Sequence, residues 1–311
     1  MIKLAGHVPV LLEEAIEYLE VRHNGIYVDM TTGGGGHSKR ILEKLDGTGH
    51  LFCFDQDEFA LGEAKKNLAR YANVVFINDN FVNCRKQLSS LGIEKVDGIL
   101  YDLGVSSYQF DMPDRGFSYR QEGPLDMRMD KTNPITASII VNTYPEKELG
   151  NIFYRYGEDP FARPIARKIV EYRMKKTIET TSELVDIIKS ALPQAILHKK
   201  GHPAKQVFQA LRIVVNDELG VLEKSLFDSV DILKPGGRIV VITFHSLEDR
   251  ICKDMFKRLS TIEIPKGLPV IPDEKPVLKL VTRHVVKPSD DEINDNNRAH
   301  SAKLRAVEKT L

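Results

Sequence analysis

A run of four consecutive glycines, Gly33–Gly36, is the feature of this 311-residue sequence that most restricts its fold. The run follows a short apolar segment, Ile26–Met30, which predicts a buried strand, and it precedes an amphipathic pattern that predicts a helix from His37. Glycine lets the backbone turn sharply and lets a ligand approach closely, and the free N–H groups at a helix start face that ligand. We therefore expect a site for a nucleotide-like ligand. A glycine-rich turn without a ligand is the competing interpretation.

Details of this loop distinguish between candidate ligands. Gly33 and Gly35 fit the first two positions of the dinucleotide fingerprint G-x-G-x-x-G, but Ser38 stands at the third. The Gly-Lys-Ser/Thr triplet that ends a Walker phosphate loop does not follow. Asp29 lies at the end of the predicted strand, where its carboxylate would repel a pyrophosphate and attract a cationic amine. These features favour S-adenosylmethionine, which carries an ammonium and a sulfonium group.

The overall composition is that of an ordinary soluble protein, without the signs of a secreted or metal-binding one. Hydrophobic residues make up 42% of the chain and charged residues 28%, as in ordinary soluble globular proteins. The 44 Lys and Arg balance the 44 Asp and Glu, so the net charge indicates no partner. Three cysteines without metal-binding spacing predict a reduced, cytoplasmic compartment, and the histidines form no metal-binding pattern, so no metal is expected. The N-terminal segment predicts an amphipathic helix rather than a signal peptide.

Apolar runs that alternate with helical patterns predict an α/β fold with a mostly parallel, doubly wound sheet. After the first strand, the predicted parallel strands are His50–Phe54, Val74–Ile77, Val96–Tyr101 and Arg238–Phe244. A proline-rich loop, residues 265–276, precedes two further strands, Val277–Thr282 and Lys303–Val307, which are expected to form an antiparallel closing hairpin. The acidic segment Asp290–Asn297 is expected to be a solvent-exposed loop.

The strand pattern is interrupted between residues 109 and 204, where only helical periodicities occur. We therefore expect a helical insert at 109–204 within a sheet domain formed by residues 1–108 and 205–311. A long amphipathic segment, residues 205–233, is expected to lead back to the sheet.

The helical insert also carries helix-start patterns and a concentration of positive charge. Thr143 and Thr180 are each followed three residues later by Glu, which predicts two capping boxes. Residues 161–212 contain 11 Lys and Arg but 4 Asp and Glu, so this stretch has a net charge of +7 and the rest of the chain −7. Such a basic lobe indicates contact with a nucleic-acid backbone, and a solvated helical face is the alternative.

Three residues that follow predicted strands are candidate ligand contacts. Asp55 lies about 20 residues beyond the glycines, where a doubly wound fold places a carboxylate for ribose hydroxyls. Phe81 can contact an adenine face or begin the core face of the next helix. Asp102 can accept hydrogen bonds from the exocyclic amine of a nucleobase or bind the cofactor. Simple turn roles are the alternatives for both aspartates.

Phe244, His245 and Ser246 follow the last predicted parallel strand. Ser246, with Asp249 three residues later, predicts a helix N-cap rather than a nucleophile, because no G-x-S-x-G elbow is present. His245 can contact a substrate from the strand end, and Phe244 can stack on a base.

Six segments, in the same order and over nearly the whole chain, resemble the RsmH/MraW family of bacterial methyltransferases. They are GHVPVLLEEAI (Gly6–Ile16), VDMTTGGGGHS (Val28–Ser38), DGILYDLGVSSYQFD (Asp97–Asp111), RGFSYRQEGPLDMRMD (Arg115–Asp130), FQALRIVVNDEL (Phe208–Leu219) and FHSLEDR (Phe244–Arg250). The resemblance implies a class I S-adenosylmethionine-dependent methyltransferase, Rossmann-like, with an inserted helical domain. It also implies methylation of the N4 amino group of a cytidine in the decoding centre of 16S ribosomal RNA, with the small ribosomal subunit as partner. A homodimer is compatible with the sequence.

The resemblance assigns the family's S-adenosylmethionine contacts, residue by residue, to Gly35, Gly36, His37, Asp55, Phe81, Asp102 and Gln109. Asp102 is also the candidate catalytic residue, through the target amine. The segment Thr31–Gly34 departs from the family, which often has a bulkier residue there, but smaller residues still allow a ligand to approach. Two other functions stay open: a dinucleotide-dependent oxidoreductase, which Ser38 disfavours, and a non-catalytic RNA-binding assembly factor.

Overall fold

The computed structural model describes residues 9–199, 201–262 and 275–310, and the chain divides into two compact units. The first unit is formed from residues 1–104 and 219–311, and the helical unit from residues 105–218. Most of the proline-rich loop predicted at 265–276 lies outside the described residues.

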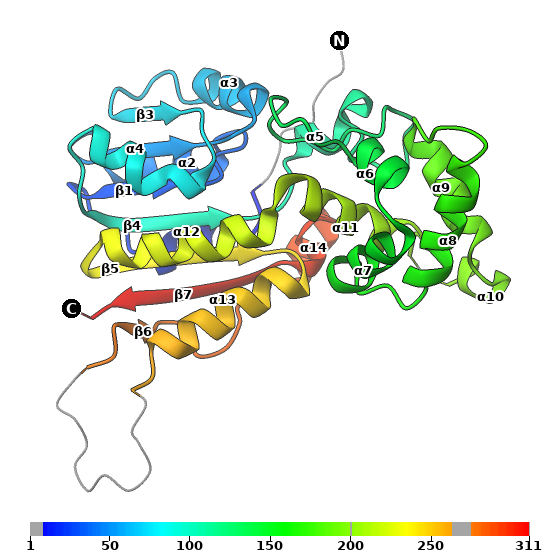
Figure 1. Ribbon diagram of the computed structural model, residues 1–311. Coiled ribbons are helices and arrows are strands. Elements are labelled where there is room, and N and C mark those ends of the chain that lie inside the picture. The colour runs from blue at the N-terminus through cyan, green and yellow to red at the C-terminus, as the bar shows by residue number, and fades with distance from the viewer. Residues whose placement is uncertain (1–8, 200, 263–274, 311) are drawn as a thin grey trace, which may run out of the picture. The chain divides into compact units, whose positions relative to one another are not determined.

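In the described part of the first unit, seven strands form one sheet in the order β3-β2-β1-β4-β5-β7-β6 (Figure 1). The strands are β1 (Ile26–Asp29), β2 (His50–Phe54), β3 (Val74–Ile77), β4 (Val96–Asp102), β5 (Leu233–Thr243), β6 (Leu278–Leu280) and β7 (Lys303–Lys309). The strands β1 to β5 pair in parallel, and β7 pairs antiparallel with both β5 and β6. The predicted Rossmann-like sheet with an antiparallel closing pair is confirmed.

Helices cover both faces of this sheet, so successive strand residues are buried on opposite sides. Val28, Phe52 and Tyr101 pack into the cluster with α4, α12 and α13, while Tyr27 and Leu100 pack into the cluster with α1 and α2. Figure 1 shows α4, α12 and α13 on the near face. The helices are α1 (Leu12–Leu19), α2 (Gly36–Lys44), α3 (Glu58–Asn67), η1 (Phe81–Asn83), α4 (Cys84–Ser90), α12 (Glu218–Ile232), α13 (Ser246–Leu259), α14 (Asp290–Asp295) and η3 (Ala299–Ser301).

The predicted loop at Asp290–Asn297 is wrong, because α14 occupies most of it. The Ser289 hydroxyl accepts a hydrogen bond from the Glu292 N–H at 3.1 Å, which satisfies one of the free amides at the helix start. Asp290, Asp291 and Glu292 form the first turn, where negative charge interacts favourably with the helix dipole. The acidic residues that indicated a loop therefore stabilise a helix start.

The helical unit contains its own apolar core, built from α6 to α9 and α11. Its helices are α5 (Ser107–Asp111), η2 (Pro113–Arg115), α6 (Ala137–Thr143), α7 (Glu146–Gly157), α8 (Ala162–Arg173), α9 (Thr181–Ser190), α10 (Gln194–Leu197) and α11 (Lys205–Asn216). The capping box at Thr180 and Glu183 is confirmed. The one at Thr143 is wrong, because Thr143 ends α6 and Pro145 stands at the N-cap of α7 without a side-chain hydrogen bond.

The end of the helical unit lies further along the chain than the expected insert end at residue 204. The helix α11 packs along α7, and a Cβ on Gly157 would lie 2.7 Å from the carbonyl oxygen of Gln206. Asp217 adopts a left-handed conformation with φ 47°, so the predicted continuous segment 205–233 is broken into α11 and α12. Within the described ranges, no helix combines the length and apolarity that a membrane span requires.

Candidate functional site

The glycine loop connects β1 to α2 at the carboxyl end of the sheet in the first unit. Gly33 and Gly35 adopt left-handed conformations, with φ 52° and φ 84°, which side chains with a Cβ rarely adopt. Gly36 begins α2, and a Cβ there would lie 2.2 Å from Cγ of Pro9. Backbone conformation and close packing thus require glycine at these three positions, whether or not a ligand binds.

Asp29, the last residue of β1, is buried and holds the loop from inside. Its Oδ1 accepts a hydrogen bond from the Thr31 N–H at 3.1 Å, and its Oδ2 accepts one from the Ser38 hydroxyl at 2.6 Å. Burial raises the pKa of Asp29 to about 6, although both hydrogen bonds act in the opposite direction. Asp29 is 1% exposed, and its two oxygens have partners in the loop and in α2, so Asp29 has a structural role here.

Asp55 follows β2 and connects two loops. Its Oδ2 accepts from the Gly33 N–H at 2.8 Å, and its Oδ1 accepts from the Asp57 N–H at 2.9 Å. Burial raises the pKa of Asp55 to about 7, against these two hydrogen bonds, and the nearby carboxylates of Asp57 and Asp29 raise it further. Each oxygen keeps a second lone pair, so the group can still accept hydrogen bonds from a ligand's hydroxyls.

Asp102 ends β4 and has a buried oxygen without a partner. Its backbone N–H donates to Thr31 Oγ1 at 2.7 Å, but in the described part of the chain nothing hydrogen-bonds to its Oδ1. Burial, followed by the charges of Asp29 and Glu248, raises the pKa of Asp102 well above its usual value. An unpaired buried carboxylate oxygen is costly, and a cationic donor from a ligand would remove that cost.

His37 contacts the other oxygen of Asp102. The imidazole is 5% exposed, its Nε2 lies 3.2 Å from the carbonyl oxygen of Val10, and its Nδ1 lies 3.5 Å from Asp102 Oδ2. A carbonyl can only accept, so Nε2 carries a hydrogen. The contact between Nδ1 and Oδ2 is attractive only if a second proton lies on one of these two groups. His37 therefore positions one oxygen of Asp102, and the other oxygen stays available.

Phe81 begins η1, immediately after the turn that follows β3. The Asn80 side chain accepts from the Val82 N–H at 3.0 Å and caps this short helix. The Phe81 ring packs edge-to-face on Tyr101, with 5.6 Å between ring centroids. The side chain is only partly buried, so it joins the core of the first unit and keeps some exposed surface.

Gln109 lies in the helical unit, whereas the other six expected cofactor contacts lie in the first unit. It forms a capping box at the start of α5: its Oε1 accepts from the Ser106 N–H at 3.0 Å, and its own N–H donates to Ser106 Oγ at 3.4 Å. The side chain is 4% exposed. The observed role of its carboxamide oxygen is therefore helix capping.

The predicted N-cap at Ser246 is wrong, because His245 caps α13 in a capping box with Glu248. The ring Nδ1 of His245 accepts from the Glu248 N–H at 3.4 Å, and its Nε2 lies 3.0 Å from Glu248 Oε1. The other oxygen of Glu248 accepts from the Phe244 N–H at 2.8 Å. Sequence reasoning missed the capping role of Glu248, although its spacing from His245 was the available signal. It also missed the hydrogen bond between Thr31 and Asp102, because Thr31 follows β1 and Asp102 ends β4.

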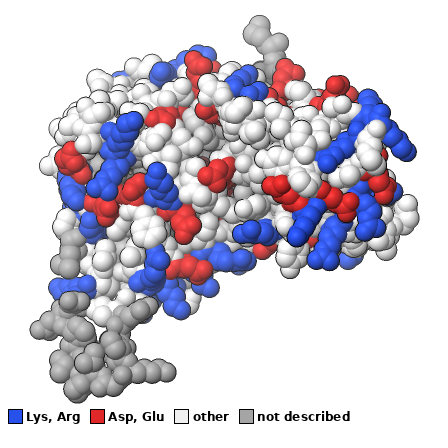
Figure 2. Space-filling model, viewed as in Figure 1, with Lys and Arg blue, Asp and Glu red and all other residues white. Residues whose placement is uncertain are grey.

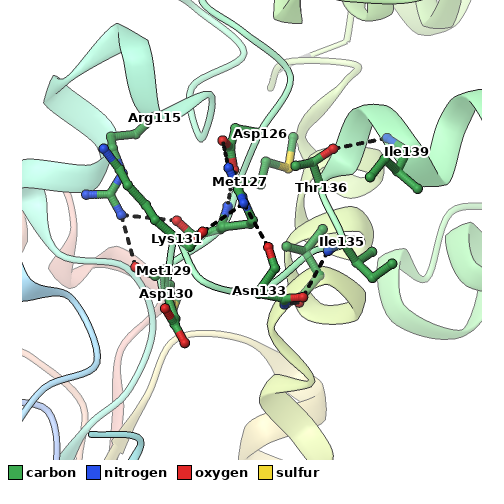
Figure 3. Close-up of polar contacts among 12 residues, drawn as sticks. Arg115, Asp126, Met127, Met129, Asp130, Lys131, Asn133, Ile135, Thr136 and Ile139 are labelled. Carbon is green, nitrogen blue, oxygen red and sulfur yellow. Dashed lines mark hydrogen bonds and ion pairs between the residues drawn. The ribbon is translucent and has the colours of Figure 1, made fainter. Parts of the chain in front are cut away.

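Charged side chains, some of its own and that of Arg115, hold the backbone of the loop with the sequence GPLDMRMD, residues 123–130 (Figure 3). Asp126 binds Arg128 through two parallel hydrogen bonds of 2.7 and 2.8 Å. Arg128 also donates to the carbonyls of Lys131 and Asn133, and Arg115 donates to those of residues 128 and 129. These arginines stabilise the loop, which allows Met127 its left-handed φ of 65°.

The basic residues of the helical unit are interleaved with carboxylates (Figure 2). Lys168 pairs with Glu171 at 2.7 Å, Lys176 pairs with Glu183, and Arg167 lies 3.9 Å from Glu146; Arg173 donates to the carbonyl of Val141 at 2.8 Å. Of the six basic residues from Arg163 to Lys176, two are exposed and have side chains without an ion-pair or hydrogen-bond partner among the described residues: Arg163 and Lys175. Those two are therefore the least compensated of the six basic residues from Arg163 to Lys176.

Comparisons with known proteins agree over nearly the full chain. A family model described as the MraW methylase family matches residues 4–310. Two relatives named ribosomal RNA small subunit methyltransferase H, from Streptococcus dysgalactiae subsp. equisimilis and Streptococcus pyogenes serotype M4, are 55% and 54% identical, each over 99% of this chain and 99% of the relative. The solved structure of an rRNA methylase from Streptococcus thermophilus matches with a TM-score of 0.45 at 12% identity, covering 99% of this chain and 100% of that one. A score this low adds nothing to the sequence matches.

Proposed function

Because the chain belongs to the MraW methylase family, we propose that it is an S-adenosylmethionine-dependent methyltransferase that modifies the N4 amino group of a cytidine in the decoding centre of 16S ribosomal RNA. The full-length match to relatives named ribosomal RNA small subunit methyltransferase H supports ribosomal RNA as the substrate. The enzyme would act in the cytoplasm, on RNA within the small ribosomal subunit.

One observation carries the cofactor assignment: the buried Oδ1 of Asp102 has no partner among the described residues. It lies at the carboxyl end of the sheet, where open α/β folds bind their ligands. The ammonium of S-adenosylmethionine is a suitable donor for this oxygen, and the two ribose hydroxyls suit the remaining lone pairs of Asp55. The glycine loop and His37 would line the same end of the sheet, and Phe81 would contact the adenine. A pyrophosphate would be repelled by these carboxylates, which disfavours a dinucleotide.

The bound cofactor supplies an electrophilic methyl group on its sulfonium, and the protein supplies alignment. The amino nitrogen of cytosine is a weak nucleophile because its lone pair is delocalised into the ring. Holding the nitrogen in line with the methyl group can account for much of the acceleration. The methylated nitrogen is strongly acidic, so a dedicated strong base is unnecessary. We assign Asp102 to the cofactor rather than to the target amine, because Leu103-Gly104 provides no rigid proline support for an amine acceptor.

The helical unit would provide the RNA-binding surface. Arg163 and Lys175, the least compensated of the six basic residues from Arg163 to Lys176, are suitable partners for phosphates. The assignment of Gln109 as a cofactor contact depends on the family resemblance alone.

The direct test measures transfer of a labelled methyl group from S-adenosylmethionine to small ribosomal subunits and, in parallel, to free 16S ribosomal RNA. We expect N4-methylated cytidine after digestion to nucleosides, with a higher yield on the subunit. Label in another nucleoside would refute the N4 assignment. Binding of RNA without any transfer to either substrate would instead identify a non-catalytic assembly factor.

Substitution of Asp102 by Asn separates the two roles considered for this residue. If the carboxylate holds the cofactor's ammonium, affinity should fall by about 1.5–3 kcal/mol, the usual value of a hydrogen bond to a charged group. Single-turnover transfer at saturating cofactor should then be largely retained. Unchanged cofactor affinity with a greatly reduced single-turnover rate would instead assign Asp102 to the target amine. In that case only the transition state would have lost an interaction.

A further inference from the structure

Three buried hydroxyl groups form a chain inside the apolar core of the first unit, between β4 and α12. Tyr101 Oη lies 2.7 Å from Ser225 Oγ and 2.7 Å from Ser229 Oγ. None of these three side chains is more than 1% exposed. Leaving a buried hydroxyl without a partner costs about 1–3 kcal/mol, so these groups depend on one another.

The chain of hydrogen bonds continues to the backbone of Phe81, and that contact determines which hydroxyl donates to which. Ser225 Oγ lies 3.4 Å from the carbonyl oxygen of Phe81. A carbonyl can only accept, so Ser225 donates its hydrogen to Phe81. Because each hydroxyl has one hydrogen, Tyr101 must donate to Ser225, and Ser229 must donate to Tyr101. This single order gives every hydroxyl hydrogen an acceptor.

The same tyrosine contacts Phe81 a second time, through its ring. The two rings meet edge-to-face, with an angle of 89° between their planes. Such aromatic pairs contribute about 0.5–1.5 kcal/mol beyond the area they bury. Phe81 begins η1, which is only three residues long, so contacts from the core matter for its placement. Its carbonyl is held by Ser225 and its ring by Tyr101.

We infer that Tyr101 and Ser225 are positioning residues, which hold Phe81 in the orientation in which its ring contacts the adenine of the cofactor. This inference rests on the proposed function. Both residues act through Phe81, since they are buried in the core and do not themselves face a ligand.

A pair of serine variants on α12 tests the inference. Ser225→Ala removes the donor to the Phe81 carbonyl, whereas Ser229→Ala, one helical turn away, removes only the far end of the chain. We expect Ser225→Ala to weaken S-adenosylhomocysteine binding about five- to ten-fold and Ser229→Ala to change it by less than about two-fold. Binding of 5′-methylthioadenosine, which has the adenosine part without the ammonium, should weaken by the same factor in Ser225→Ala.

Melting temperatures of both variants distinguish positioning from general stability. A purely structural role predicts a similar loss of melting temperature for both serines and similar binding by both variants, and that result would overturn the inference. Tyr101→Phe keeps the ring but removes the hydroxyl. Like Ser225→Ala, it should weaken the binding of both S-adenosylhomocysteine and 5′-methylthioadenosine. If the unmodified protein binds neither ligand, the proposed function is itself wrong and the inference fails with it.

Discussion

At the scale of single residues, three aspartates at neighbouring strand ends differ in exposure and in hydrogen bonding. Asp29 and Asp55 each have one partner on each oxygen, but Asp29 is 1% exposed whereas Asp55 is only partly buried. Asp102 has a buried oxygen with none among the described residues. The closeness of these carboxylates contributes to the raised pKa of Asp55 and of Asp102. The two aspartates that we expect to face a ligand are Asp102, which has the unpaired oxygen, and Asp55, which is less buried than Asp29.

The raised pKa of Asp55, about 7, predicts that cofactor binding depends on pH. Below this value the free protein holds a proton on Asp55, and a neutral carboxyl is a weaker acceptor for ribose hydroxyls. S-adenosylhomocysteine affinity should therefore rise as the pH increases from about 6 to 8, and binding near pH 7 should release protons. Calorimetry in buffers with different ionisation enthalpies measures this release.

Asp55→Asn is the control for that experiment, because its amide cannot titrate. It should weaken binding by about 1–3 kcal/mol at pH 8 and should reduce the pH dependence. The same proton release from both proteins would exclude Asp55 as the titrating group.

At the scale of elements, one sequence pattern has two structural outcomes. Thr180 caps α9, because its hydroxyl oxygen accepts a hydrogen bond from the Glu183 N–H at 3.2 Å. The Glu183 carboxylate in turn accepts one from the Thr180 N–H at 3.1 Å. Thr143, the last residue of α6, instead donates its hydroxyl hydrogen to the carbonyl oxygen of Ile139. The next helix, α7, has Pro145 at its N-cap, so Thr143 does not stand at a helix start.

This difference predicts unequal stability effects for two matched substitutions. Thr180→Ala should lower the free energy of unfolding by about 0.5–2 kcal/mol, the usual cost of losing an N-cap. Thr143→Ala should change it by less than about 0.5 kcal/mol, as expected for an exposed site without a cap. Urea denaturation of both variants measures the two values, and equal losses would contradict the assignment of the cap to Thr180 alone.

At the scale of the whole molecule, a neutral chain concentrates positive charge on one stretch of its helical unit. Binding of RNA phosphates by Lys and Arg releases counterions, so affinity should fall steeply as salt increases. Neutralising Arg163 and Lys175 together should reduce the slope of log affinity against log salt by about 0.7–0.9 for each phosphate that the variant no longer neutralises.

Lys168 and Lys176, which pair with Glu171 and Glu183, provide the matched comparison. Their neutralisation should reduce the slope less, because part of their charge is already compensated. S-adenosylhomocysteine affinity should stay the same in both double variants. A slope equal to that of the unmodified protein in both would mean that these charges form only a solvated face.

The sequence by itself determined the elements whose pattern is local. The strands His50–Phe54 and Val74–Ile77 have the predicted bounds, because each is a short, continuous run of mostly apolar residues. The glycine loop could also be predicted from the sequence, since Gly33 and Gly35 adopt conformations that favour glycine. Local rules failed at Asp290, where acidic residues suited a helix start as well as a loop.

Only the tertiary structure decided which side chains of the first unit are satisfied and which are not. The hydroxyl of Tyr101 meets a serine 124 residues away, and Ser225 reaches a carbonyl 144 residues away. The unpaired oxygen of Asp102, which has no partner among the described residues, likewise depends on burial by several segments and not on its neighbours in the chain. Hydrophobic periodicity is a property of consecutive residues, whereas hydrogen-bond satisfaction is a property of groups that folding brings together. The sequence could therefore indicate where a ligand binds, but not which atoms are left to bind it.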